Sequence, residues 1–215
     1  MVKVKICGLT REEDVEAAID AGADSLGFVV GVPSSLRNIT LSRAKELSSK
    51  IPENVNSVAV TVFKDLDELK RIYRELDTDF VQLHGSLYPF LESIVMLSFG
   101  RRIIRVVNAK AANALDLAGE YSRIFNAVLL DTAGVGGVGG TGVTHDWELS
   151  SRIRDAIHPF PLILAGGLTC ENVGEAVRKV RPYGVDVSSG VEKSPGVKDH
   201  EKMFEFIRRV KEVVL

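Results

Sequence analysis

Two side chains that can exchange protons close two β-branched runs of the sequence. Cys7 ends the run "VKVKIC" and Asp131 ends the run "NAVLLD". Thiols and carboxyl groups are among the groups that transfer protons in enzymes. A carboxylate after an apolar run is costly to bury unless it has a partner or a function. Simpler interpretations stay open, since Cys7 could be a small buried hydrophobe and Asp131 a cap or loop hydrogen-bond acceptor.

Two glycine-containing segments late in the chain could bind an anion. They read "AGGLT", residues 165–169, and "SSGVE", residues 188–192. Glycines let backbone N–H groups approach a phosphate, and serine hydroxyls add donors. The candidate phosphate ligands are Gly166, Gly167, Ser188, Ser189 and Gly190. The alternative is that both segments are only tight turns.

A third segment resembles a dinucleotide-binding fingerprint. Gly134, Gly136 and Gly139 spell G-x-G-x-x-G directly after an apolar run. In a dinucleotide fold the glycine turn opens the next helix, but here about fourteen residues separate Asp131 from the helical pattern "DWELSSRIRDAI". We interpret the match as accidental and expect a mobile lid over the catalytic face. The alternative is a surface loop without a role.

Eight β-branched runs must position these side chains. They start at residues 2, 25, 56, 79, 102, 126, 161 and 184, and successive starts lie 23 to 35 residues apart. Helical patterns such as "REEDVEAAIDAG" and "LDELKRIYREL" lie between them. This repeat predicts parallel βα units and an α/β fold, a single (β/α)8 TIM barrel forming one domain over residues 1–215. An open sheet with fewer strands is the alternative.

A barrel would bring the candidate residues together. Its active site lies at the carboxyl ends of the strands, and Cys7, His84, Asp131, Gly166 and Ser188 all stand at or next to such ends. His84 could contact a substrate or only form a hydrogen bond in the barrel mouth.

The alternation of side chains along strands predicts one contact inside the barrel. Lys5 shares a strand face with Cys7, and Asp186 shares one with Ser188. The first and last strands are neighbours in a closed barrel, so we hypothesise that Lys5 and Asp186 meet there. A nearby cation could also lower the pKa of the Cys7 thiol. Alternatively, the lysines of this strand extend from its edge into solvent.

Composition narrows the class of protein. The chain has 215 residues, 45% of them hydrophobic, and a net charge of -2 from 27 basic and 29 acidic side chains. We therefore expect no nucleic-acid partner. The apolar runs are too short to span a bilayer and the N-terminus lacks a signal-peptide pattern, so we expect no membrane partner. Two cysteines are too few for a disulfide framework, which favours a cytoplasmic location. No ligand cluster suggests a metal or an organic cofactor.

Several motifs together resemble the phosphoribosylanthranilate isomerase family of tryptophan biosynthesis. They are "KICGLT", "VQLHG", "LLDT" with "GGTG" and "DW", "LAGGLT" and "VDVSSGVE". The resemblance implies an Amadori rearrangement of N-(5′-phosphoribosyl)anthranilate into the open-chain aminodeoxyribulose phosphate. It implies Cys7 as general base, Asp131 as general acid and Arg37 as the group that binds the anthranilate carboxylate. The expected partner is thus a phosphosugar substrate, and the expected assembly is a monomer or a homodimer.

The sequence departs from this family's pattern at four positions. Leu36 replaces a proline, so we expect Arg37 to be less rigidly placed; Val143 and His145 change the glycine-rich loop; and Cys170 replaces a proline that starts a helix. Two other classes stay open. One is another phosphosugar barrel enzyme, such as an epimerase or an indole-forming synthase. The other is a non-catalytic phosphosugar-binding barrel, which would not require Cys7 or Asp131.

Overall fold

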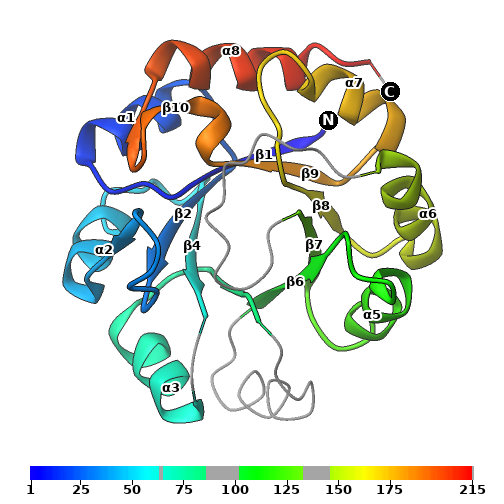
Figure 1. Ribbon diagram of the computed structural model, residues 1–215. Coiled ribbons are helices and arrows are strands. Elements are labelled where there is room, and N and C mark those ends of the chain that lie inside the picture. Colours follow the sequence, from blue (N-terminus) through cyan, green and yellow to red (C-terminus); the bar gives the residue numbers. More distant parts are fainter. Residues whose placement is uncertain (63–64, 86–101, 133–145, 215) are drawn as a thin grey trace.

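Eight parallel strands close into a barrel in the computed structural model, which describes residues 1–62, 65–85, 102–132 and 146–214 (Figure 1). The barrel strands are β1 (Lys3–Cys7), β2 (Ser25–Val30), β4 (Asn56–Thr61), β5 (Phe80–Leu83), β6 (Arg102–Asn108), β7 (Ala127–Asp131), β8 (Leu162–Leu164) and β9 (Gly184–Val187). Each strand pairs with the next, and β1 pairs with both β2 and β9, which closes the ring. The predicted (β/α)8 TIM barrel is therefore confirmed, and the open sheet is excluded.

Helices surround this barrel (Figure 1). Those within the described residues are α1 (Glu12–Asp20), α2 (Leu41–Ser48), α3 (Leu66–Glu75), α5 (Ala114–Tyr121), α6 (Trp147–Ile157), α7 (Val173–Val180) and α8 (His200–Lys211). The predicted lid, residues 134–142, and the helical segment expected between β5 and β6 lie outside the described residues.

Side-chain caps fix where several helices begin. Thr40, Asp65, Asp146 and Asp199 each accept a hydrogen bond from a backbone N–H in the first turn of α2, α3, α6 and α8. Such caps satisfy backbone donors that have no partner inside the helix. They therefore set where each helix begins, and with it the length of the loop that leads from the preceding barrel strand.

Two hydrophobic clusters hold the layers together. The larger one lies between the strands and the helices and includes Ile6, Val30 and Val107. The smaller one fills the barrel interior and includes Cys7, Val29 and Leu129. Because strand side chains alternate between the two faces, the cluster to which a residue belongs shows whether it points into the barrel.

Four short elements were not expected. They are β3 (Asn38–Ile39), the 3-10 turn η1 (Ser189–Val191), β10 (Glu192–Ser194) and β11 (Val197–Lys198). Strand β3 extends the sheet next to β2, and β10 and β11 form an antiparallel hairpin between β9 and α8. Among the described helices, none has the length and apolar character to cross a bilayer.

Candidate active site

Cys7 and Asp131 end their strands on the same face of the barrel. Cys7 is the last residue of β1 and is 7% exposed, and Asp131 is the last residue of β7. In the ring of strands, β9 and β8 lie between β1 and β7. The two strands between them, β8 and β9, lead into the loops that carry the candidate phosphate ligands.

Lys5 and Asp186 meet inside the barrel, as hypothesised. Lys5 Nζ donates to Asp186 Oδ1 at 2.7 Å, and their side chains are 4% and 9% exposed. The two residues are direct partners in the β1–β9 register. Burial is the largest single effect and acts to lower the pKa of Lys5, but the charges of Asp186 and Cys7 and the hydrogen bonds to them together outweigh it and raise the pKa. Lys5 therefore stays a buried ammonium ion at neutral pH.

Gly27 makes room for Cys7 and Lys5 on the adjacent strand. A Cβ atom added at Gly27 would lie 3.0 Å from both Cys7 Sγ and Lys5 Nζ. The nearby cation was expected to lower the pKa of the thiol. Instead, burial dominates and raises the pKa of Cys7 above its ordinary value, although Lys5 acts in the opposite direction. Lys5 thus acts in the expected direction, but desolvation in the barrel interior is the larger effect and decides the direction of the net shift.

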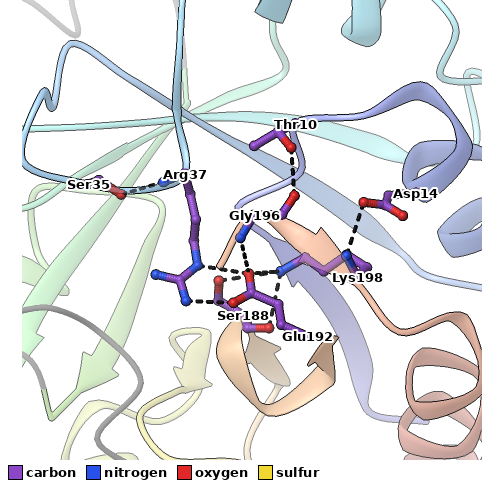
Figure 2. A network of polar contacts seen from close by, with 8 residues as sticks. All are labelled: Thr10, Asp14, Ser35, Arg37, Ser188, Glu192, Gly196 and Lys198. Atoms are coloured by element: carbon purple, nitrogen blue, oxygen red, sulfur yellow. Dashed lines mark hydrogen bonds and ion pairs between the residues drawn. The ribbon is translucent and has the colours of Figure 1, made fainter. Parts of the chain in front are cut away.

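Arg37 lies beside the end of β9, although it comes from the loop after β2 (Figure 2). Its Nε donates to Glu192 Oε1 at 2.8 Å and its Nη2 donates to Glu192 Oε2 at 2.6 Å. The side chain of Arg37 is 11% exposed. The guanidinium is thus held through two of its nitrogens, and the expectation that Leu36 leaves Arg37 less rigidly placed than a proline would stays a prediction.

The two candidate phosphate loops pack against each other. A Cβ atom added at Gly190 would overlap the carbonyl oxygen of Leu168, so the loop after β9 contacts the loop after β8. Gly166 and Gly167 both have positive φ, 81° and 69°, a conformation that favours glycine. Asn172 braces the turn, accepting from Thr169 N and donating to Gly167 O.

Gly8, in the loop after β1, connects this region to Cys7. With φ +73°, it leaves room for two side chains, because an added Cβ would lie 2.6 Å from Arg37 Cδ and 2.8 Å from Ser188 Oγ. The backbone after Cys7 therefore lies directly against the arginine and the first serine of the "SSGVE" segment.

His84 follows β5 and forms a hydrogen bond in the barrel mouth. Its Nε2 lies 2.9 Å from Gln82 Nε2, and its backbone N–H donates to Thr61 O. Burial, followed by the charges of Lys5 and Arg105, lowers the pKa of His84 to about 4. The imidazole is therefore neutral at pH 7.

The second cysteine differs from its expected placement. Helix α7 begins at Val173, with Asn172 as its N-cap, so Cys170 precedes the helix rather than starting it. Burial, followed by the charges of Glu171 and Glu205, raises the pKa of this thiol. Its Sγ instead donates to the Lys202 carbonyl of α8 at 3.2 Å.

Within the ranges that the structure describes, no three His, Cys, Asp or Glu side chains are grouped as a metal site requires. The absence of a metal and of an organic cofactor stays a prediction from the sequence.

Glu192 and Lys198 were not expected at the site from the sequence. Glu192 was visible as the last residue of "SSGVE", but its partner Arg37 is 155 residues away in the sequence. Lys198 is completely buried and contacts Glu192 at 2.8 Å. A charged residue in a two-residue strand carries no pattern that would reveal it.

Comparison with known proteins identifies the family. A family model described as "N-(5'phosphoribosyl)anthranilate (PRA) isomerase" matches residues 4–209. The chain is 46% identical over 211 residues to an N-(5'-phosphoribosyl)anthranilate isomerase from Methanothrix thermoacetophila, with 98% of this chain and 99% of the relative covered.

Solved structures agree. Phosphoribosyl anthranilate isomerase from Thermotoga maritima is 36% identical with a TM-score of 0.87, covering 99% of this chain and all of the other. A complex of such an isomerase with reduced 1-(o-carboxyphenylamino)-1-deoxyribulose 5-phosphate is 34% identical with a TM-score of 0.85 and the same coverage. With the same barrel and near-complete coverage at this identity, the chain belongs to the N-(5′-phosphoribosyl)anthranilate isomerase family.

Proposed function

We propose that this protein converts N-(5′-phosphoribosyl)anthranilate into 1-(2-carboxyphenylamino)-1-deoxyribulose 5-phosphate, an Amadori rearrangement of tryptophan biosynthesis. One observation carries the assignment of the site. The paired loops after β8 and β9 are flanked in the ring by β7, which ends at Asp131, and by β1, which ends at Cys7. A sugar whose phosphate is bound by these loops would have a carboxyl group on one side and a thiol on the other.

These two groups suffice for the reaction. Asp131, when protonated, gives its proton to the furanose ring oxygen as the bond between that oxygen and the anomeric carbon breaks, leaving an iminium ion. The iminium acidifies the proton on the adjacent carbon, and the Cys7 thiolate removes it. The resulting enolamine then takes up a proton and becomes the ketone.

The reaction requires the proton to lie on the carboxyl group of Asp131 and not on the thiol of Cys7, which is the reverse of the ordinary order. At their ordinary pKa values, ~3.9 and ~8.5, the carboxyl group is ionised and the thiol protonated at neutral pH. Burial raises the pKa of Cys7 further. The ammonium of Lys5, hydrogen-bonded to Asp186 and close to Cys7, partly offsets that effect and stabilises the thiolate when it forms.

The remaining groups bind the substrate. Gly166, Gly167, Ser188, Ser189 and Gly190 would bind the phosphate. Within the described chain, no protein group accepts a hydrogen bond from the N–H of Gly166 or Gly167. Arg37 would bind the anthranilate carboxylate, since a guanidinium can donate two parallel hydrogen bonds to it. His84, neutral and at the end of β5, would contact the substrate as a hydrogen-bonding group rather than as a cation.

Turnover by the purified protein tests the proposal. The substrate is fluorescent, so its consumption can be followed directly. We expect turnover by the wild type and near-complete loss of kcat in Asp131→Asn, since an amide does not donate a proton to the ring oxygen at neutral pH. A wild-type protein that binds the substrate without converting it would instead support a non-catalytic phosphosugar-binding barrel. Turnover of an epimerase or indole-synthase substrate would support the other enzyme class.

We expect the enzyme to act as a monomer or homodimer in the cytoplasm, without nucleic-acid or membrane partners. Light scattering of the purified protein checks the assembly.

A further inference from the structure

A glutamate lies directly against the arginine that we assign to an anionic substrate group. Glu192 is 5% exposed, and Oε1 and Oε2 both accept from Arg37 (Figure 2). Taken alone, a buried carboxylate at this place would neutralise the arginine and repel a second carboxylate. Two features of the structure resolve this conflict.

The first feature is the edge of the guanidinium that Glu192 occupies. A guanidinium can bind a carboxylate through Nε with one terminal nitrogen, or through its two terminal nitrogens. Glu192 takes Nε and Nη2. In Figure 2, Nη1 of Arg37 points away from Glu192, and no protein group among the described residues accepts a hydrogen bond from it. The edge made by Nη1 and Nη2 is therefore available for a second carboxylate.

The second feature is a buried lysine that balances the charge. Lys198 Nζ donates to Glu192 Oε1 at 2.8 Å, and its side chain is 0% exposed. Burial lowers the pKa of Lys198, while the charge of Glu192 and the hydrogen bond to it act to raise that pKa. With Lys198 in its ammonium form, the three side chains together carry one net positive charge, so an anion at the open edge still meets a cation. Burial acts to raise the pKa of Glu192, but hydrogen bonds from Arg37 and the charge of Lys198 keep it below its ordinary value, so Glu192 stays ionised.

The same lysine joins the arginine to the phosphate loops. Lys198 Nζ also donates to the carbonyl of Ser188 at 3.1 Å, and its backbone N–H donates to Asp14 Oδ2 at 3.1 Å. Gly196 N donates to Glu192 Oε1 at 3.4 Å, and Thr10 Oγ1 donates to the carbonyl of Gly196. The β10–β11 hairpin is thereby fixed to α1 and to the end of β9.

We propose that Glu192 and Lys198 are positioning residues that hold the open edge of Arg37 at a fixed place relative to the phosphate loops, so that the site selects substrates carrying a carboxylate at that distance. This inference rests on the proposed function. It assigns to the hairpin after β9 a role in specificity rather than in the proton transfers.

Two substrates separate positioning from general stability. Ribose 5-phosphate condenses with anthranilate to give an adduct with the carboxylate, and with aniline to give the same adduct without it. In Glu192→Gln we expect KM for the anthranilate adduct to rise about tenfold with kcat within about threefold, because an amide cannot accept from both guanidinium nitrogens. For the aniline adduct, kcat/KM should stay within about twofold of the wild type. Equal losses on both adducts, or no loss on either, would overturn the inference.

The charge-balanced variant Glu192→Gln/Lys198→Met removes the effect of an unpaired buried lysine. It should recover the thermal stability lost in Glu192→Gln but keep the raised KM for the anthranilate adduct. Recovery of that KM together with stability would show a merely structural role and overturn the inference. Glu205→Gln is the matched control, since this glutamate pairs with Arg208 and Arg209 on α8, and its KM should not change.

Arg37→Ala distinguishes a failure of the proposed role of Arg37 from a failure of the inference about Glu192. It should raise KM for the anthranilate adduct by at least as much as Glu192→Gln does. Adding Glu192→Gln to Arg37→Ala should change KM by less than about twofold, because Glu192 acts through Arg37. If Arg37→Ala leaves KM unchanged, the role of Arg37 in the proposed function is wrong and the inference fails with it. If Arg37→Ala raises KM and Glu192→Gln does not, only the inference fails.

Discussion

Lys5 and Asp186 form an ion pair in the barrel interior, at 2.7 Å between Nζ and Oδ1, across the seam where the last strand meets the first. The pair joins β9 to β1 and places an ammonium ion beside the thiol of Cys7. Substitutions at its two residues should therefore change both the stability of the barrel and the pKa of Cys7.

Removal of Lys5 should destabilise the barrel strongly. Lys5→Met leaves Asp186 buried without its cation, and breaking a buried pair in this way costs about 3–5 kcal/mol of unfolding free energy. Lys5→Met/Asp186→Leu should recover most of that loss, because apolar side chains of similar size can replace both charges. Urea denaturation measures both variants.

Lys3→Met is the matched control on the same strand. Lys3 pairs with Asp24, but its side chain is 53% exposed, so the loss should stay below about 1 kcal/mol. A Lys5→Met protein as stable as this control would show that the ion pair contributes little.

The pH profile should report the raised pKa of Cys7. In the reactive form Asp131 holds a proton and Cys7 has lost one, so the pair carries one proton in total. The profile of kcat/KM should therefore be level at neutral pH, fall at acid pH where the pair takes up a second proton, and fall at alkaline pH above the Cys7 pKa, where the last proton is lost. Since burial raises this pKa, the alkaline fall should lie above the ordinary thiol value of ~8.5. His84, with its pKa lowered to about 4, should add no step between pH 6 and 7.

Lys5→Met provides the internal comparison for this profile. Removing the ammonium raises the pKa of the thiol further, so the alkaline fall should move to higher pH. The value of kcat/KM at neutral pH should decrease at the same time. An alkaline fall at or below the ordinary thiol value in the wild type would contradict the proposed base.

The barrel and the Lys5–Asp186 pair were predictable because both follow from local pattern. Runs of β-branched residues mark the strands, and the predicted starts at Asp79, Asn126 and Pro161 lie one residue before β5, β7 and β8. Closure of the ring then places the first and last strands side by side, and alternation selects which side chains face inward.

The Arg37–Glu192–Lys198 cluster could not be predicted for the opposite reason. Its members come from the loop after β2 and from a hairpin whose strands have three and two residues, and neither has a periodic pattern. The pKa direction of Cys7 was also beyond the sequence. It depends on whether desolvation or the Lys5 charge is larger, and only the packing around the thiol decides that balance.

Phosphate binding should depend on the contact between the loops after β8 and β9. Gly190→Ala adds a Cβ against the Leu168 carbonyl and should separate the loops. We expect KM to rise at least about tenfold and competitive inhibition by inorganic phosphate to weaken in parallel, since the N–H groups no longer converge on one anion.

Gly119→Ala is the control for this change, because a Cβ at Gly119 in α5 meets nothing within 4 Å. It should leave both constants unchanged. A Gly190→Ala enzyme with normal KM and normal phosphate inhibition would place the phosphate elsewhere.

The two cysteines allow the sharpest test of the base. Both are free and buried, and burial raises the pKa of each thiol, so reactivity toward a thiol reagent does not distinguish them. Their positions do. Cys7 ends β1 on the catalytic face, whereas the thiol of Cys170 donates to the Lys202 carbonyl of α8.

A serine hydroxyl is close to a thiol in size but far less acidic, so it retains the packing and removes the base. We therefore expect Cys7→Ser to unfold at the wild-type temperature and to lose at least about a hundredfold in kcat, the lower end of what general-base catalysis contributes. Cys170→Ser should keep near-normal turnover, and a fully active Cys7→Ser enzyme would mean that another group removes the proton.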